Sequence, residues 1–228
     1  MAMKSQTAED LMSVLGHELR SPLTAIRGAS SLLLMAHSDL PPEKVVELLR
    51  VIDSQAGRMA DRVDDVLVAG RLAAGELSLM EEEVELADVI ADVLEDARGQ
   101  ATDRRIRAPG VVEGVTVMGD QQRVTQVLRV LVENAIRFSP PGSPVEVRVA
   151  AQRGMARIEV RDRGQGIAAE YRERVFERGI RLDESGPGAG LGLYVASGLA
   201  AAMGGSAGAE PRAGGGATVW FTLPTATK

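Results

Sequence analysis

The chain has 228 residues, enough for one large domain or two small ones, with 45% hydrophobic and 25% charged residues as in globular proteins. Its formal net charge of −6 makes it a poor candidate for general binding to nucleic acids or anionic membranes. Cysteine is absent, which excludes disulfides, zinc–thiolate sites and thiol catalysis.

The longest apolar helical run, residues 32–36, is far shorter than the ~20 residues that span a bilayer. We therefore expect no membrane contact by this chain and a cytoplasmic location. A missing sensor region could still anchor the full-length parent in a membrane.

The first third of the chain has the apolar period of helices. Steps of three and four connect Leu11 to Leu33, and again Val45 to Leu67, with Pro41 and Pro42 between the two runs. This pattern predicts two long helices in a hairpin over residues 1–75. Because one hairpin cannot cover both of its apolar stripes, we expect a homodimeric four-helix bundle. Coverage of the stripes by the second domain is the alternative.

Residues 76–228 have mixed patterning. Helices are predicted at 86–100, at about 121–138 with Asp120 as the N-cap, near 169–176 and at 191–203. Strands are predicted at 76–79, 115–118, 145–149, 156–161, 206–210 and 217–223. The fold class is therefore α+β: a helical hairpin, then an α/β sandwich whose mixed sheet has helices on one face.

The first stretch with chemical potential is Glu133–Phe138, on a predicted helix. The carboxamide oxygen of Asn134 suits a hard cation such as Mg²⁺, and Arg137 lies on the same helix face, where it could reach a phosphate. Taken alone, the stretch is more typical of an ordinary polar helix face than of a binding site.

Two glycine-containing stretches follow. Asp162–Ile167 comes directly after a strand, where a buried aspartate can accept a hydrogen bond from an exocyclic amine and glycines let the backbone approach a flat ligand. Gly186–Leu193 opens a helix, where backbone N–H groups can bind an anion. The alternatives are a strand-end turn and a flexible linker.

Taken together and in order, these stretches resemble the two-component sensor histidine kinases over nearly the whole chain. Five segments are similar to the motifs of that family. They are His17–Pro22 for the phosphoacceptor box, Glu133–Phe138 for the asparagine box, Asp162–Ile167 and Gly188–Leu193 for the two glycine boxes, and Val175–Arg178 for the phenylalanine box.

The resemblance implies that residues 1–75 form a dimerisation and phosphotransfer hairpin and 76–228 a Bergerat-type ATP-binding domain. It implies that ATP phosphorylates His17, which then passes the phosphoryl group to an aspartate of a response regulator. Asn134 would hold Mg²⁺ and Asp162 would bind the adenine amino group. The other residues implied in nucleotide binding are Arg137, Phe138, Gly164, Gly166, Ile167, Arg178, Arg181, Gly188, Gly190, Leu191, Gly192 and Leu193.

Three positions depart from the family pattern. Val130 stands where the family often has a first asparagine and related ATPases have a water-activating glutamate, which argues against simple ATP hydrolysis. Ser21 replaces the threonine or asparagine that, four residues after the histidine, supports phosphatase activity toward the regulator. The segment 181–188 is short, so we expect a short, mobile ATP lid.

The helix period bears on the phosphoacceptor itself. At ~100° per residue, His17 lies roughly 150° from the centre of the apolar stripe, on an outward strip with Ser21 and Thr24, whereas Pro22 faces inward and bends the helix. Glu18 can take a proton from the imidazole, or it is simply a solvated helix charge. We expect a hinge near residues 70–75. The rival functions are an ATPase clamp and a non-catalytic dimeric scaffold.

Overall fold

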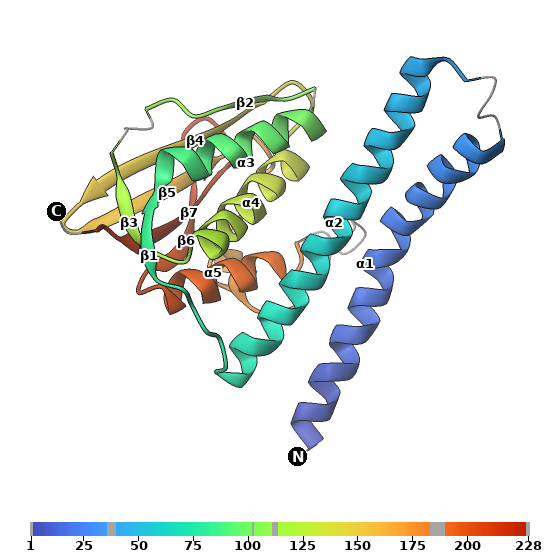
Figure 1. The fold of residues 1–228 in the computed structure, drawn as a ribbon. Coiled ribbons are helices and arrows are strands. Elements are labelled where there is room, and N and C mark those ends of the chain that lie inside the picture. The colour runs from blue at the N-terminus through green and yellow to red at the C-terminus, as the bar shows by residue number, and fades with distance from the viewer. Residues whose placement is uncertain (1, 36–39, 102, 111–113, 183–189, 227–228) are drawn as a thin grey trace.

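Two long helices form the N-terminal hairpin of the computed structural model, which describes residues 2–35, 40–101, 103–110, 114–182 and 190–226 (Figure 1). Helix α1 spans Ala2–Met35 and helix α2 spans Pro42–Ala74. Pro42 occupies the first turn of α2, where its missing N–H costs nothing. Pro22 is buried inside an uninterrupted α1, which confirms its inward position.

Helix α2 ends at a left-handed glycine. Gly75 has φ = 68°, and the N–H of Glu76 donates to the carbonyl of Arg71 at 2.9 Å, the pattern of a glycine C-cap. Gly70 lies inside the helix, and the hinge expected near residues 70–75 stays a prediction. The chain leaves helical geometry only at Gly75.

The second part of the chain is an α/β sandwich. Its helices are α3 (Leu86–Gln100), α4 (Gln121–Phe138) and α5 (Gly192–Ala202), with two short 3₁₀ turns, η1 (Ala169–Tyr171) and η2 (Arg174–Phe176). Its strands are β1 (Glu82–Glu85), β2 (Arg105–Arg107), β3 (Thr116–Gly119), β4 (Pro144–Gln152), β5 (Met155–Arg161), β6 (Ser206–Pro211) and β7 (Ala217–Pro224).

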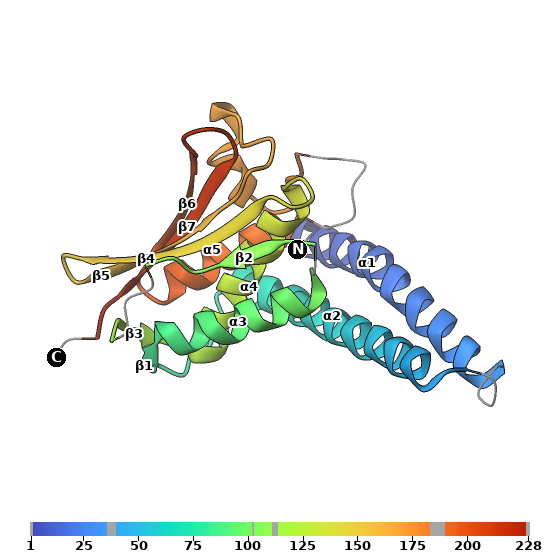
Figure 2. The ribbon, with the colours of Figure 1, turned by 90° about the horizontal axis from the view of Figure 1, so that it is seen from above.

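Five strands form one mixed sheet in the order β2-β4-β5-β7-β6, in which only β2 and β4 run parallel. Strands β1 and β3 form a separate antiparallel pair. Helices α3, α4 and α5 lie on one face of the large sheet, as Figure 2 shows from above. The predicted α+β class, with a mixed sheet covered by helices on one face, is confirmed.

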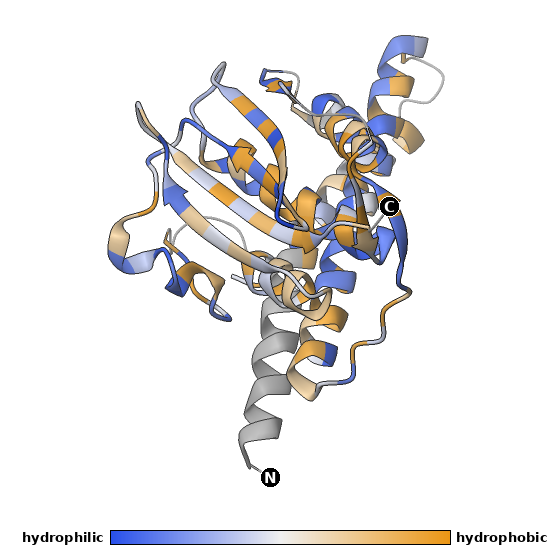
Figure 3. Ribbon diagram, turned by 90° about the vertical axis from the view of Figure 1, so that its left-hand side faces the viewer, coloured by the Kyte–Doolittle hydropathy of each residue, from blue (hydrophilic) through white to orange (hydrophobic). Residues whose placement is uncertain are grey.

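Alternation along the strands explains the two faces of the sheet. In β5, Ala156, Ile158 and Val160 are buried while Arg157 and Glu159 face outward, and the same alternation of hydrophobic and hydrophilic residues is visible in Figure 3. The buried side chains meet those of α3–α5 in one core. Burying such a set of aliphatic side chains is the main favourable term in folding.

Three details differ from the expected elements. Residues 76–79 form no strand; the strand starts at Glu82, because residues 82–85 have a partner in β3 and 76–79 have none. The helix expected at 169–176 is the pair of 3₁₀ turns η1 and η2. Strand β2 has only three residues, too few for a periodic signal, and was not predicted.

Helix α2 joins the two parts of the molecule. Its C-terminal residues Val68 and Ala69 are buried in the core of the α/β sandwich, and Leu72 packs on Gly198 of α5 so closely that a Cβ there would lie 2.6 Å from a Leu72 methyl carbon. In Figure 1, α2 lies between α1 and the sandwich. Within the described residues, no helix combines the length and the apolarity needed to cross a membrane.

Candidate active site

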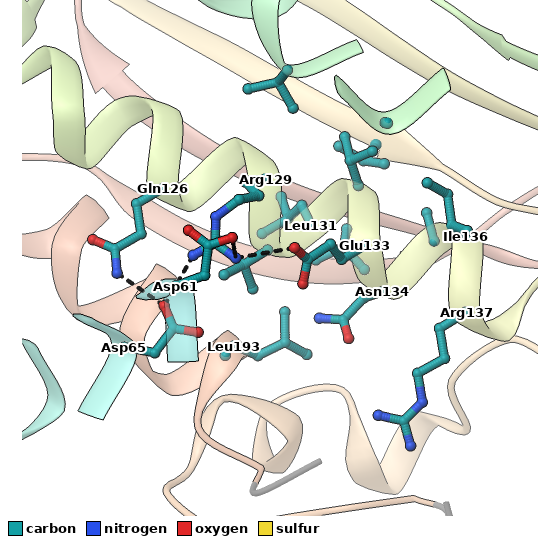
Figure 4. Close-up of a pocket in the computed structure, with 18 of the residues that line it drawn as sticks. Asp61, Asp65, Gln126, Arg129, Leu131, Glu133, Asn134, Ile136, Arg137 and Leu193 are labelled. Atoms are coloured by element: carbon teal, nitrogen blue, oxygen red, sulfur yellow. Dashed lines mark hydrogen bonds and ion pairs between the residues drawn. The ribbon is translucent and has the colours of Figure 1, made fainter. Parts of the chain in front are cut away.

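A large cavity of about 1280 Å³ lies where α4, the turn after β5 and the start of α5 meet, and it extends to the side of α2 (Figure 4). Its walls include most of the residues singled out from the sequence, which are listed here: Asn134, Arg137, Phe138, Asp162, Gly166, Ile167, Arg181, Gly190, Leu191, Gly192 and Leu193. Its volume is above the usual range for small-ligand pockets.

Helix α4 supplies the polar side chains of one wall. Its N-terminus is fixed by Asp120, whose carboxylate accepts a hydrogen bond from the N–H of Arg123 at 3.1 Å, as predicted. One turn apart at the other end, Asn134 and Arg137 point toward the cavity in Figure 4. The guanidinium carbon of Arg137 lies 5.0 Å from the ring centre of Phe138. A neutral oxygen and a cation therefore face the same space.

Asp162 forms the opposite end of the cavity. It follows β5, is only 6% exposed, and its Oδ1 accepts hydrogen bonds from the N–H of Gly164 at 2.7 Å and of Ala217 at 3.2 Å. Both donors converge on one oxygen, and among the described residues no hydrogen bond reaches Oδ2. A carboxylate held in this way can accept a hydrogen bond from an amine in the cavity.

Three glycines shape the cavity by close backbone approach. A Cβ on Gly164 would collide with the carbonyl of Phe138, so Gly164 packs against the end of α4 and does not line the cavity. Gly190 has φ = 67°, and a Cβ there would lie 2.7 Å from the backbone of Gly179. A Cβ on Gly192 would lie 3.1 Å from Val130. Glycine is required at positions 164 and 190 because backbone lies too close for a Cβ, whereas at position 192 a Cβ would make a tight contact with a side chain.

Two family models match the chain. Residues 7–75 match the His Kinase A (phospho-acceptor) domain, and residues 119–227 match the histidine kinase-, DNA gyrase B- and HSP90-like ATPase. The sensor histidine kinase TrcS of Mycobacterium tuberculosis is 36% identical over 90% of this chain and 41% of its own length. A solved structure of a mycobacterial sensor histidine kinase, MprB, is 30% identical, with a TM-score of 0.60 over 65% of this chain and all of its own.

The chain belongs to the sensor histidine kinase family. A second solved structure, full-length ShkA in complex with AMPPNP, is 30% identical, with a TM-score of 0.65 over 96% of this chain and 46% of its own. The chain spans between 25% and 59% of the length of eight curated relatives that it matches. Residues 119–227, which match the ATPase family model, supply most of the cavity wall.

Residues 17–22, which are similar to the family's phosphoacceptor box, lie in α1. His17 and Glu18 are within the helix, but their side chains are outside the described ones. Ser21 and Thr24 are exposed, as the helix period predicted. Within the described part of α1, no residue lines the cavity. The structure thus gathers the nucleotide-site candidates and leaves the phosphoacceptor candidates apart from them.

The remaining nucleotide-site candidates are placed differently. Arg178 is half-buried and does not line the cavity, whereas Ile180 and Arg181 do. Gly188, together with most of the short segment expected to form the lid, lies outside the described residues. Val130 is 2% exposed and packs against Gly192, so an apolar side chain occupies the place at which related ATPases have a carboxylate.

A charged contact between α2 and α4 was not predicted. Arg129 lies 3.2 Å from Asp65 and 3.0 Å from Glu133, and Gln126 donates to Asp65 at 2.9 Å. The contact has a second arginine, since Arg62 lies 2.8 Å from Glu133. We name these five residues the α2–α4 clasp. Figure 4 shows three of its acidic and basic side chains beside Asn134.

Burial and charge compete in this contact. Burial alone would lower the pKa of Arg129, but the carboxylates of Asp65, Glu133 and the neighbouring Asp61 outweigh it and raise that pKa. Burial raises the pKa of Asp61, which the charge of Arg129 only partly offsets. Arg129 is therefore held as a cation. Asp61 and Asp65 of α2 thus lie at an interface between the hairpin and the α/β sandwich.

A second missed segment is the hairpin between β6 and β7. Gly216 has φ = 93°, and a Cβ there would collide with the carbonyl of Asp162, while Ala217 donates to the Asp162 carboxylate. The run of three glycines at 214–216, just before a strand, was the signal that could have identified it.

Proposed function

We propose that this chain is the catalytic core of a sensor histidine kinase: it transfers the γ-phosphoryl group of ATP to His17 and then to an aspartate of a response regulator. The observation that carries the proposal is the single cavity that collects Asn134, Asp162 and the glycines of residues 190–192 from three distant segments. Residues 1–75 act as the phosphotransfer hairpin and 76–228 as the ATP-binding domain, in the cytoplasm, where ATP is available.

Different residues of the cavity bind the base and the phosphates of the nucleotide. The Asp162 carboxylate accepts a hydrogen bond from the adenine amino group, and Gly166 and Ile167 lie against the base. Arg137 and Arg181 neutralise phosphate charge, and Phe138 lies along the nucleotide. The glycines before α5 let the backbone approach the phosphates, whose charge the N-terminus of that helix favours.

Magnesium fits this site only together with the nucleotide. Among the described residues there is no group of three His, Asp or Glu side chains that could hold a metal by itself. The carboxamide oxygen of Asn134 is one suitable hard ligand, and phosphate oxygens and water would complete the shell. When bound, Mg²⁺ neutralises the charge of the phosphates.

Phosphoryl transfer needs a neutral imidazole. A free imidazole has a pKa near 6.5, so its neutral form is the major one at pH 7. One ring nitrogen attacks the γ-phosphorus, the bond to the β–γ bridging oxygen breaks, and ADP leaves. Glu18 accepts the proton from the other nitrogen and orients the ring. The nitrogen–phosphorus bond then breaks when the regulator's aspartate attacks.

The ATP-binding domain must move for this transfer. No described residue of α1 lines the cavity, and α2 lies between α1 and the sandwich. The α2–α4 clasp therefore belongs to a conformation that precedes transfer. Motion about residues 75–81, which form no helix or strand, would carry the cavity toward a phosphoacceptor helix.

Two partners complete the proposal. A second copy of the chain covers the hairpin, which exposes large apolar side chains: Leu23, Leu32, Leu34, Met35, Val46, Leu49, Val63 and Leu67. The α/β sandwich covers Val68 and Ala69 at the C-terminal end of α2 instead. A response regulator docks on the exposed strip of Thr24, Arg27 and Gly28, about two to three turns past His17. Ser21 supports removal of phosphate from the regulator.

One assay tests the proposal against its rivals. The chain is incubated with γ-labelled ATP and Mg²⁺, and His17→Gln and Asn134→Ala are compared with the wild type. A kinase gives acid-labile, alkali-stable protein label that both substitutions abolish. His37→Gln, which changes the only other histidine of the sequence, is the matched control and keeps the label.

The other outcomes contradict the proposal. Released phosphate without labelled protein identifies an ATPase, an activity that the buried Val130 already argues against. Neither label nor released phosphate, with nucleotide binding retained, identifies a scaffold. Label that persists in His17→Gln and disappears in His37→Gln would identify His37 as the phosphoacceptor and contradict the assignment of His17.

A further inference from the structure

A buried arginine–glutamate pair lies next to the backbone of Asp162. Arg212, at the end of β6, and Glu146, in β4, have side chains that are only 6% and 5% exposed, and Arg212 Nη2 lies 2.9 Å from Glu146 Oε2. Arg107 of the edge strand approaches the same carboxylate at 2.6 Å. Because burying two charges costs several kcal/mol, the pair does not by itself argue for stability, and its specific contacts need an explanation.

The second hydrogen bond of Arg212 supplies one. Its Nη1 donates to the backbone carbonyl of Asp162 at 3.0 Å, across fifty residues of sequence. Glu146 thus anchors one arm of the guanidinium while the other arm holds the aspartate's own peptide. Arginine suits this task because its planar fork fixes two acceptors at once.

The contact is reinforced from the opposite direction. Arg163, the residue after Asp162, donates through Nη1 to the carbonyls of Ala213 at 3.0 Å and Gly214 at 2.9 Å. Two arginines thus link the turn after β5 to the loop of the β6–β7 hairpin. Each lies in one of these two segments and donates to backbone carbonyls of the other. The Ala217 N–H, from the same hairpin, reaches the Asp162 carboxylate.

We propose that Arg212 and Glu146 are positioning residues for Asp162 and through it set the preference of the cavity for a purine that carries a 6-amino group. The inference rests on the proposed function, in which Asp162 accepts a hydrogen bond from that amine. Hydrogen bonds weaken steeply with distance and angle. Loss of the Arg212 bond would release the Asp162 peptide and misalign its carboxylate.

A comparison of two nucleotides in the wild type and in an Arg212 variant tests this role. Binding of ATP and of purine riboside triphosphate, which lacks the 6-amino group, is measured by titration calorimetry on the full chain with Mg²⁺. The wild type should prefer ATP by about tenfold, the effect of one charge-assisted hydrogen bond. Arg212→Met should lower ATP affinity about tenfold and change the affinity for the analogue less than about twofold, so that the preference disappears.

Arg157→Met is the matched control. Arg157 belongs to the same sheet and pairs with Glu159 and Glu210 at 2.9 Å, on the outward face and without a described contact to Asp162. This variant should keep the full preference. If Arg212→Met does not fold, Glu146→Gln is the variant to use, because it weakens the pair with Arg212 and keeps the side-chain volume. It should reduce the preference for ATP over the analogue about threefold.

The failures are distinguishable. A wild type that binds both nucleotides equally contradicts the assignment of Asp162 and the inference with it. A wild type that prefers ATP, together with a folded Arg212→Met that keeps the preference or weakens both nucleotides equally, contradicts the role of Arg212 alone and leaves the proposed function intact.

Discussion

Arg62 of α2 and Glu133 of α4 lie 71 residues apart in sequence and 2.8 Å apart in space, and Glu133 immediately precedes Asn134. The helical hairpin is therefore bonded to the residue next to the candidate magnesium ligand. Both side chains are about one third exposed, so this pair alone contributes little, about 0.5 kcal/mol. The buried Asp65 beside it, 3% exposed, makes the contact as a whole significant.

Release of the α2–α4 clasp should change both shape and activity. Arg129→Met removes one of the two arginines that pair with the buried Asp65 carboxylate, the other being Arg62 at 3.2 Å. Loss of a partner from a buried carboxylate is costly. We expect a larger radius of gyration in X-ray scattering and faster His17 phosphorylation, because the domain is freed to move. Arg50→Met, at an exposed position of α2 outside the clasp, should change neither. An expanded but slower variant would instead place the clasp in the transfer conformation.

The packing of Val130 on Gly192 predicts a coupled pair. Gly192→Ala brings a methyl group to 3.1 Å from Val130 and should destabilise the fold by about 1 kcal/mol. Val130→Ala alone should also destabilise by about 1 kcal/mol through the cavity it leaves. The double variant should lose about 1 kcal/mol less than the sum, measured by urea unfolding. Strict additivity would show that the methyl group added at position 192 does not contact Val130.

Glu146 predicts an acid-sensitive contribution to stability. Burial alone would raise its pKa, but the hydrogen bond from Arg107 and the charge of Arg212 outweigh burial and lower the pKa below 4.5. An acid with a lowered folded-state pKa stabilises the fold above its unfolded pKa and loses that contribution as pH falls through the folded value. The advantage of wild type over Glu146→Gln in free energy of unfolding should therefore shrink below pH 4.5. Parallel pH profiles would contradict this.

The exposed apolar stripe of the hairpin predicts loss of the dimer on adding charge. Leu49 is 52% exposed, and burying a leucine contributes about 1.5–3 kcal/mol, twice over in a two-fold interface. Leu49→Glu should shift the chain from dimer to monomer in light scattering. Arg50→Glu puts the same carboxylate on the adjacent exposed residue and should leave the dimer intact. Dimers in both variants would exclude this face of the hairpin as the dimer interface.

Local signals were sufficient for most of the fold. The three-and-four period up to Leu33, the two prolines at 41–42, the Asp120 cap and the alternation of β5 each act within a few residues, so helices and long strands could be predicted. Short elements could not: β2 has three residues, and residues 76–79 look like a strand but lack a partner. Whether an extended segment pairs depends on what lies beside it.

The sequence by itself determined the family motifs, the long helices and the candidate nucleotide residues, because each depends on residue type and short spacing. Only the tertiary structure decided that Arg212 holds Asp162, that residues 61–65 face Arg129, and that Val130 fills the space beside Gly192. These contacts join residues about fifty or more positions apart, and charge pairing or van der Waals contact at that separation has no periodicity from which it could be predicted.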